Sequence, residues 1–258
     1  MTEARLAPSP AGTFAALTRA EFTAYTRSAR TLLWTVLLPL LILVLGEVGV
    51  PAALRHTAAP VLQGSASAIT AGIFALGLFG YATVLANYRD RGVFQRLRCS
   101  PAPTWQLLAA RLLVQLVGVV AQAIIVFAAA RAVYGFAPGW AGAGLAAAAV
   151  LVAGLAALAV GQVVAALARS AGSVTGVARV LLFAFFLLEG AFVSTQSWPA
   201  WLLHTANWTP VRMTLNLLTA GVVRQHWGAA DDRYLLGLLA WVVVLGYVGL
   251  SRFRWDPE

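Results

Sequence analysis

The stretch NYRDRGVFQRLRCSPAPTWQLLAAR (residues 87–111) decides the fold, because it places five arginines and one acid between two long apolar runs. A connector this short holds only a turn or two of helix at a membrane surface. Val93, Phe94 and Leu97 recur at helical spacing, so that helix has one apolar face amid positive charge. This pattern is typical of a segment that docks on anionic lipid or on a protein partner.

The composition of the whole chain indicates several membrane spans. Of the 258 residues, 60% are hydrophobic and 10% are charged, and the mean hydropathy is +0.81. Soluble domains are about half apolar and about a quarter charged. A net charge of +9 would suggest nucleic acid as a partner of a soluble protein, but here the basic residues flank apolar runs. We therefore expect a multi-pass membrane protein that binds lipid and no nucleic acid.

The basic residues also limit the chemistry, since all 18 are arginine and the chain has no lysine. A nucleotide-binding P-loop needs its lysine, and a Schiff-base enzyme needs an amine. Any ATP hydrolysis must then occur on a partner, which would hold the ATP and magnesium, and this chain needs no cofactor. No HExxH or GxSxG motif occurs, and the acids do not pair within the apolar runs. We expect neither a metal site nor catalytic residues, and the single Cys99 forms no internal disulfide.

Six apolar runs predict an all-α polytopic fold with six transmembrane helices, because a span needs about 20 mainly apolar residues. We place them at 31–50, 66–86, 105–130, 142–168, 180–195 and 234–250, within a membrane domain of residues 31–251. Its inner connector covers 87–106, and residues 252–258 form a tail. With the N-terminus inside, 13 of the 18 arginines fall in inner segments and 5 in outer ones. This bias favours two cytoplasmic termini, and the polar residues 1–10 predict no cleavable signal peptide.

Residues 13–30 precede the first span and predict a helix that lies in the membrane interface. Phe14, Leu17, Phe22 and Tyr25 fall broadly on one face, and the arginines fall on the other. Glu21 interrupts the apolar face. Either Glu21 pairs with a basic neighbour, such as the arginines of residues 89–98, or the helix is less regular than the amphipathic pattern predicts.

Several residues within the predicted spans indicate how the helices pack. Pro39 predicts a kink in the first span, and Arg111 can extend back to the cytoplasmic headgroups. Gln115 and Gln122 are favoured as hydrogen-bonding groups between helices over ligand contacts. Close approach of neighbouring helices is predicted at Gly72, Gly77, Gly80 and along the alanine-rich fourth span.

The connector 196–232 is apolar rather than loop-like, and its two short amphipathic pieces predict an outer re-entrant helical hairpin. Trp198 and Trp201 are typical of an aromatic belt at the outer surface. Just before this connector, Glu189 follows a long apolar run. An acid within a membrane is a functional hypothesis, although the outer interface would hydrate it if the interface lies within a few residues.

Three stretches together resemble a known family. SARTLLWTVLLPLLILVLG (28–46) is similar to a first span with an interior proline, and YRDRGVFQRLRCSPAPTWQLLAARLL (88–113) resembles the most recognisable motif of the family. EGAFVSTQSWPAWLLHTANWTPVRMTLNLL (189–218) is similar to its outer re-entrant segment. The chain thus resembles type-two permeases of ATP-binding-cassette (ABC) exporters, the group that includes daunorubicin-resistance-type multidrug exporters. It departs from the family where Glu189 replaces a small residue and where Asn207 and Pro210 are separated.

The resemblance implies a permease in a bacterial plasma membrane that exports an amphiphilic drug, antibiotic or lipid-like substrate. It implies a homodimer of permeases, with two copies of a cytoplasmic ABC ATPase bound to it. The coupling helix on the ATPase would comprise Arg89, Asp90, Arg91, Gly92, Val93, Phe94, Arg96 and Leu97. The connecting helix beside the ATPase would present Phe14, Leu17, Glu21, Phe22 and Tyr25. The substrate path or outer gate would include Glu189, Phe192, Trp198, Trp201 and Asn207.

The residues alone leave a second function open, which is a secondary transporter or channel that needs no ATPase. Such a protein needs polar side chains at a midplane site, for which the candidates are Gln115, Gln122, Gln162 and Glu189. For a membrane-bound enzyme, the sequence offers almost no candidate catalytic residues.

Overall fold

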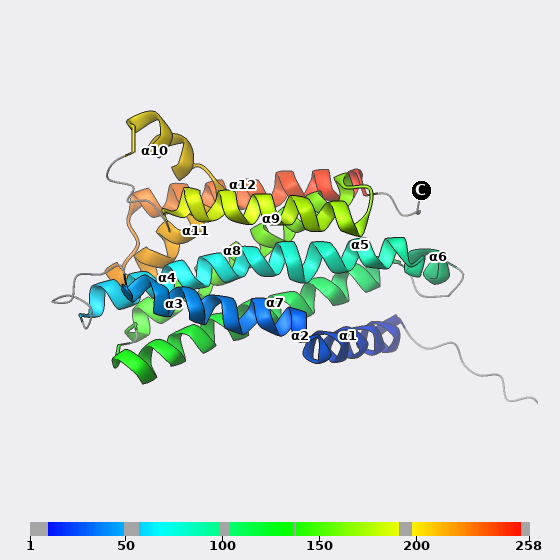
Figure 1. The fold of residues 1–258 in the computed structure, drawn as a ribbon, viewed down its shortest axis with the longest axis horizontal. Helices are drawn as coiled ribbons and strands as arrows, with labels where there is room; N and C mark the ends of the chain where they lie inside the picture. Colours follow the sequence, from blue (N-terminus) through cyan, green and yellow to red (C-terminus); the bar gives the residue numbers. More distant parts are fainter. Residues whose placement is uncertain (1–9, 49–56, 99–103, 137, 191–197, 254–258) are drawn as a thin grey trace, which may run out of the picture.

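The computed structural model of the chain describes residues 10–48, 57–98, 104–136, 138–190 and 198–253, and every regular element in these ranges is a helix. Most helices run along the long axis of an elongated bundle (Figure 1). In chain order the elements are α1 (Pro10–Arg27), α2 (Ala29–Leu32), η1 (Leu33–Leu37), α3 (Leu38–Val48), α4 (Ala58–Ala75), η2 (Leu76–Ala82), α5 (Thr83–Asp90), α6 (Val93–Arg98), α7 (Thr104–Tyr134), α8 (Trp140–Leu167), α9 (Ala171–Glu189), α10 (Ala200–Asn207), α11 (Pro210–Thr219), η4 (Ala220–Arg224) and α12 (Ala229–Ser251).

Within the described residues, five helical stretches are long and apolar enough to cross a membrane. They are Ala58–Asp90, Trp105–Tyr134, Trp140–Leu167, Ala171–Glu189 and Ala229–Ser251. The predicted first span lies in α2, η1 and α3, which follow one another directly, but its apolar part, Leu33–Gly46, is shorter. The chain is therefore an all-α polytopic membrane protein, as its composition predicts, and the number of six spans stays a prediction.

Helix α9, which corresponds to the predicted fifth span, has different ends from those predicted. It begins at Ala171, so the segment predicted as an inner loop up to residue 179 is largely helical. The reason is a capping box, in which the Ser170 hydroxyl accepts from the Ser173 amide. The helix ends at Glu189 because Gly190 takes a left-handed φ of 88°. Residue 195, the predicted end, lies outside the described residues.

Pro39, the second residue of α3, is accommodated by the π-helical segment η1, which ends at Leu37. A proline inside a helix lacks a donor, and its ring clashes with the carbonyl four residues earlier. Here the chain winds more widely over Leu33–Leu37, and the amide of Leu38 donates to the carbonyl of Leu33, five residues back. Widened turns of this kind are a recognised way for a helix to absorb an irregular residue.

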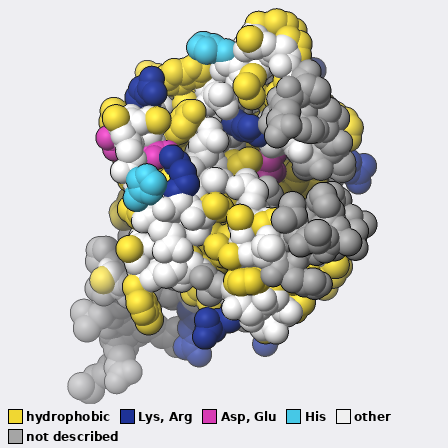
Figure 2. All heavy atoms as spheres, turned by 90° about the vertical axis from the view of Figure 1, so that its left-hand side faces the viewer, with side chains coloured by type: hydrophobic (Ala, Val, Ile, Leu, Met, Phe, Trp, Pro, Cys, Tyr) yellow, Lys and Arg dark blue, Asp and Glu magenta, His cyan; other side chains and the backbone are white. Residues whose placement is uncertain are grey.

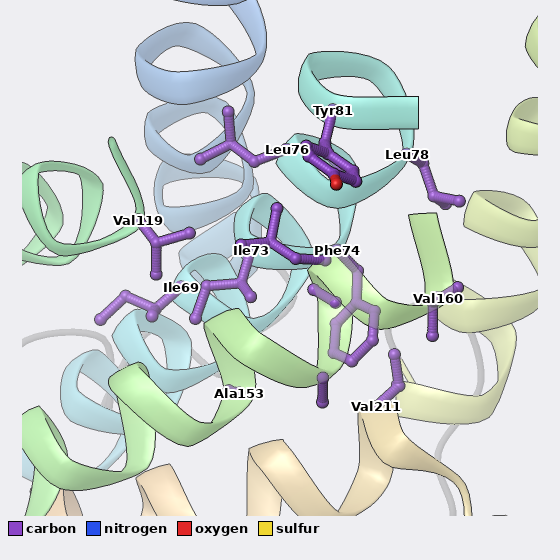
Figure 3. Close-up of a cluster of buried hydrophobic side chains, with 14 of the residues drawn as sticks. Ile69, Ile73, Phe74, Leu76, Leu78, Tyr81, Val119, Ala153, Val160 and Val211 are labelled. Carbon is purple, nitrogen blue, oxygen red and sulfur yellow. The ribbon is translucent and has the colours of Figure 1, made fainter. Parts of the chain in front are cut away.

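The centre of the bundle is the continuous helix formed by α4, η2 and α5, which is almost entirely buried. Its neighbours include α3, α7, α8, α9 and α11. In Figure 3 its apolar side chains face residues of three other helices, namely Val119 of α7, Val160 of α8 and Val211 of α11. This helix therefore organises the packing of the others.

Glycines let α8 approach the central helix closely, as predicted for Gly77. A Cβ atom built on Gly77 would lie 2.3 Å from the carbonyl oxygen of Ala157, and one built on Gly161 would lie 2.2 Å from the carbonyl oxygen of Gly77. No side chain fits between these two backbones. Gly72 and Gly80 likewise lie against the side chains of Gln122 and Gln115, both on α7.

The two ends of the bundle carry different elements (Figure 1). At one end lie α1, α6, the turn between α8 and α9, and the end of α12. At the other end lie α10, α11 and the start of α12. We call them the docking end and the outer end, after the predictions for the segments that they carry. The docking end carries the predicted coupling segment, and the outer end carries the predicted re-entrant segment.

Candidate functional site

The predicted coupling segment at the docking end forms a turn followed by the short helix α6. Gly92 takes a left-handed φ of 65°, which lets the chain reverse between α5 and α6. The side chains of Asp90, Arg91 and Arg96 are exposed. Exposed charged side chains thus stand on both sides of Gly92, with Asp90 and Arg91 before it and Arg96 on α6.

The apolar face of α6 points inward rather than toward a partner. Phe94 is completely buried, and its ring meets that of Phe253, just beyond α12, edge-on at a centroid distance of 5.5 Å. Val93 is partly buried against the same core. Phe94 is therefore an anchor for α6 and is not accessible to a docking protein. The side chain of Leu97 lies outside the described part of the structure.

Arg89 is also turned inward, and it caps the end of α8. Its guanidinium donates from Nη1 to the carbonyl of Ala165 at 2.9 Å and from Nη2 to the carbonyl of Ala168 at 2.7 Å. The side chain is only 3% exposed. A cation at a helix C-terminus satisfies carbonyls that lack intrahelical donors and is favoured by the helix dipole. Arg89 therefore fixes α8 and offers no surface to a partner.

Asp90 makes the complementary contact with the helix that follows. Its Oδ2 atom accepts a hydrogen bond of 2.8 Å from the amide of Ala171, the first residue of α9. An anion at a helix N-terminus is favoured for the same electrostatic reason. Arg89 and Asp90 therefore hold the end of α8 and the start of α9. We call this pair of contacts the clasp.

The N-terminal helix α1 packs against α7 at the docking end. Phe14 and Leu17 are half-buried, Tyr25 is buried, and Phe22 is 48% exposed. Burial raises the pKa of the Tyr25 phenol. Its hydroxyl lies 2.9 Å from that of Thr35 in η1, and thus links α1 to the first apolar helix.

Glu21 lies on the buried face of α1 and is paired, although not with the arginines of residues 89–98. Its Oε2 atom accepts from Nη1 of Arg111 at 2.9 Å, and its Oε1 atom accepts from the Tyr88 hydroxyl at 2.8 Å. Arg111 also donates from Nη2 to the carbonyl of Gly80 in η2. The carboxylate thereby joins α1, α5 and α7.

The position of Arg111 corrects the prediction that it extends to the headgroups. Its side chain is 3% exposed, and that of Glu21 is 6% exposed, so the ion pair is buried. The carbonyl of Gly80 lies in a π-helical segment, where the regular pattern of helical hydrogen bonds is interrupted. Arg111 and Tyr88 are the residues of this network whose role the sequence did not reveal. The signal available was the acid on the apolar face of α1.

The buried glutamines mainly hold helices together. Gln122 donates to the carbonyl of Ile69 at 3.1 Å, and Gln162 accepts from the Tyr81 hydroxyl at 2.7 Å. Both contacts join the central helix to a neighbour, as predicted for Gln122. Gln115 is fully buried beside Gly80, and its amide has no hydrogen-bond partner among the described residues.

The outer end contains the two short helices of the predicted re-entrant segment. Helix α11 is largely buried and contacts α4, α8 and α12, whereas Trp201 on α10 is exposed. Charged side chains are scattered over this end among apolar and neutral ones (Figure 2). Arg224 pairs with the buried Asp231, whose Oδ2 atom accepts from the amide of Gly228.

Arg212 draws several residues of the predicted outer gate together. It donates from Nη1 to the main-chain carbonyl of Glu189 at 2.6 Å and from Nε to the side chain of Asn207 at 3.4 Å. The C-terminal end of α9 is thus tied to α10 and α11. Glu189 is buried, Trp198 is half-buried, and Phe192 lies outside the described residues.

No group of three or more histidine, cysteine, aspartate or glutamate side chains that could hold a metal ion occurs within the described ranges. The charged residues brought together by the fold instead join helices, either at their ends, as Arg89 and Asp90 do, or along their length, as Glu21 does. The geometry is therefore that of a protein that positions helices, with an exposed basic surface at one end.

Comparison with known proteins agrees with this architecture. The model of the ABC-2 type transporter family matches residues 13–223, which is most of the chain. No curated protein matches the sequence. The matched region includes α1, the coupling segment and the re-entrant helices. The chain therefore belongs to the ABC-2 type transporter family and is the membrane permease of an ABC transporter.

Proposed function

We propose that this permease exports an amphiphilic drug, antibiotic or lipid-like molecule across a bacterial plasma membrane, driven by a cytoplasmic ATPase. Two ATPase subunits would bind two copies of the chain, and both termini would lie in the cytoplasm. The outward direction and the paired subunits follow from the family resemblance. The distribution of arginines supports a cytoplasmic docking end.

The observation that carries the proposal is the construction of α6. A helix of six residues is too short to be stable alone, yet it is anchored at the protein surface by Phe94. Anchoring leaves Arg96 exposed on α6, next to the exposed Arg91 of the preceding turn. A rigid, basic, solvent-facing helix suits contact with an acidic groove of a soluble protein, because complementary charges speed and orient association.

The clasp supplies a path for movement from α6 into the membrane. Arg89 and Asp90 immediately precede the turn that leads to α6, and they bind the end of α8 and the start of α9. A shift of α6 would therefore displace the inner ends of both helices. On the other side of the docking end, Glu21 ties α1 to α7. Closure of the ATPases around ATP would then move packed helices as rigid units.

Copurification tests the proposal directly. The tagged chain is purified from its native host in mild detergent, and bound proteins are identified by mass spectrometry. We expect an ATPase with a P-loop to be recovered with the native chain. The amount of this ATPase that is recovered should fall at least tenfold with R91Q/R96Q. The glutamine changes remove charge without placing acids in an inner segment.

The matched control is R131Q/R233Q, which removes two exposed arginines that lie outside the docking end. It should retain the ATPase. Equal recovery with the R91Q/R96Q variant, or no ATPase with the native chain, would contradict the proposed docking surface. Uptake of a fluorescent amphiphile into inside-out vesicles, with and without ATP, then tests the direction of transport.

A further inference from the structure

A cavity of about 600 Å³ opens between α3, α4 and α9, beside the residue that ends α9. Its volume lies in the range of about 300–1,000 Å³ that is typical of small-molecule sites. Ile42, Leu45 and Phe186 contribute apolar wall, and the polar side chains that reach it are Gln63, Ser67 and Glu189. The site thus suits a mainly apolar molecule with one polar group.

One oxygen of the Glu189 side chain lacks a partner among the described residues. The side chain is only 5% exposed, and its Oε1 atom has no hydrogen-bond partner among the described residues. Ser67 lies within hydrogen-bonding reach of the carboxylate. The side-chain oxygen of Gln63 already accepts from the Thr219 hydroxyl at 3.2 Å. A buried carboxyl oxygen without a donor is energetically unfavourable, so a ligand that donates to Glu189 would be favoured here.

The nearest cation does not supply this donor. Arg212 donates to the main-chain carbonyl of Glu189 rather than to its carboxylate, and these two side chains form no ion pair within 4.0 Å. Glu189 also stands at the C-terminus of α9, where the helix dipole adds negative potential. The dipole disfavours an anionic ligand here, and a positively charged donor would complete the site, since no described residue donates to this oxygen.

We propose that this cavity binds an amphiphile with one protonated amine, whose ammonium group donates to Glu189 and whose apolar part packs on Ile42, Leu45 and Phe186. The inference names the substrate class of the proposed exporter and rests on that function. A protonated amine supplies the opposite charge that favours the ionised form of this buried acid, which a neutral ligand cannot do. A metal ion would require further ligands, and no cluster that could supply them occurs among the described residues.

Binding to the purified chain in nanodiscs tests the proposal without any ATPase. The probes are tritiated 2-(2-naphthyl)ethylamine and 2-(2-naphthyl)ethanol, which share a ring system and differ in the charged group. We expect the native chain to bind the amine at least tenfold more tightly than the alcohol. Glu189→Gln should abolish this preference and leave the affinity for the alcohol unchanged.

Two further variants complete the design. Asp232→Asn removes one exposed acid at the outer end and should preserve the preference for the amine. Leu45→Trp adds bulk at a side chain that is 57% exposed on the cavity wall, and should weaken both probes without disturbing the core. Equal binding of the two probes by the native chain, or an unchanged preference in Glu189→Gln, overturns the proposal. Loss of ATPase copurification would contradict the proposed function alone, because the probe assay does not need the ATPase.

Discussion

Replacing either Glu21 or Arg111 with an apolar residue should destabilise the protein strongly, because the remaining charged side chain stays buried without its partner. In Glu21→Leu, the guanidinium keeps only the carbonyl of Gly80 as an acceptor. In Arg111→Met, the carboxylate keeps the hydroxyl of Tyr88. Breaking a buried pair from one side costs about 3–5 kcal/mol. We therefore expect Glu21→Leu near the upper limit and Arg111→Met near the lower limit.

The double variant E21L/R111M should recover most of this loss. It removes both buried charges and fills their volume with apolar side chains, which in other proteins is neutral or stabilising by about 1–4 kcal/mol. The coupling energy from the double-mutant cycle should then exceed about 2 kcal/mol. The half-buried Tyr88 hydroxyl can turn toward water in the double variant.

Unfolding by sodium dodecyl sulfate in mixed micelles, followed through the fluorescence of the nine tryptophans, measures these differences. A loss below about 1 kcal/mol in Glu21→Leu would place the pair in the range of exposed ion pairs. A double variant as unstable as the sum of the single ones would show no coupling. Either result refutes the assignment of this pair as the buried connection between α1 and α7.

Two other substitutions test the packing of single residues. Phe94→Ala should speed amide hydrogen exchange across α6 at least tenfold, because the helix loses its buried anchor. The control Gln95→Ala, at the exposed neighbouring residue, should leave the exchange rate unchanged. Unchanged exchange in Phe94→Ala would show that α6 is held by other contacts. Gly161→Ala should lower stability by about 1–3 kcal/mol or more, since its methyl group meets the backbone of Gly77. The same change at Gly144 of α8, where nothing lies within 4 Å, should be neutral, and equal thermal unfolding of the two variants would contradict the close contact.

The sequence predicts those features that depend on local pattern. Long apolar runs identify the spanning helices because the membrane imposes length and hydropathy on every span. Gly77 is recognisable as a contact point because only a small residue permits two backbones to meet. The short apolar pieces after residue 196 likewise predict α10 and α11, and Pro210 stands at the first position of α11.

The features that the sequence does not predict depend on partners far along the chain. Glu21 and Arg111 are 90 residues apart, and Arg89 contacts a carbonyl 76 residues away. Periodicity indicates that Phe94 lies on an apolar face, but it does not tell whether that face meets a partner or the end of α12. The π-helical turn that includes Gly80 depends equally on tertiary context. These long-range contacts and the π-helical turn leave no local pattern in the sequence.

The arginines of the coupling stretch divide by what they contact, and the division explains how one segment could both dock and transmit movement. Arg89 and Arg111 are buried, where they hold the end of α8 and the carboxylate of α1. Arg91 and Arg96 are exposed. A docking helix that carried only exposed charges could shift without moving the spans. Because the buried arginines flank the exposed ones in sequence, the proposed docking force on the outer face would reach α1, α7 and α8 through buried contacts. It would reach α9 through the exposed carboxylate of Asp90.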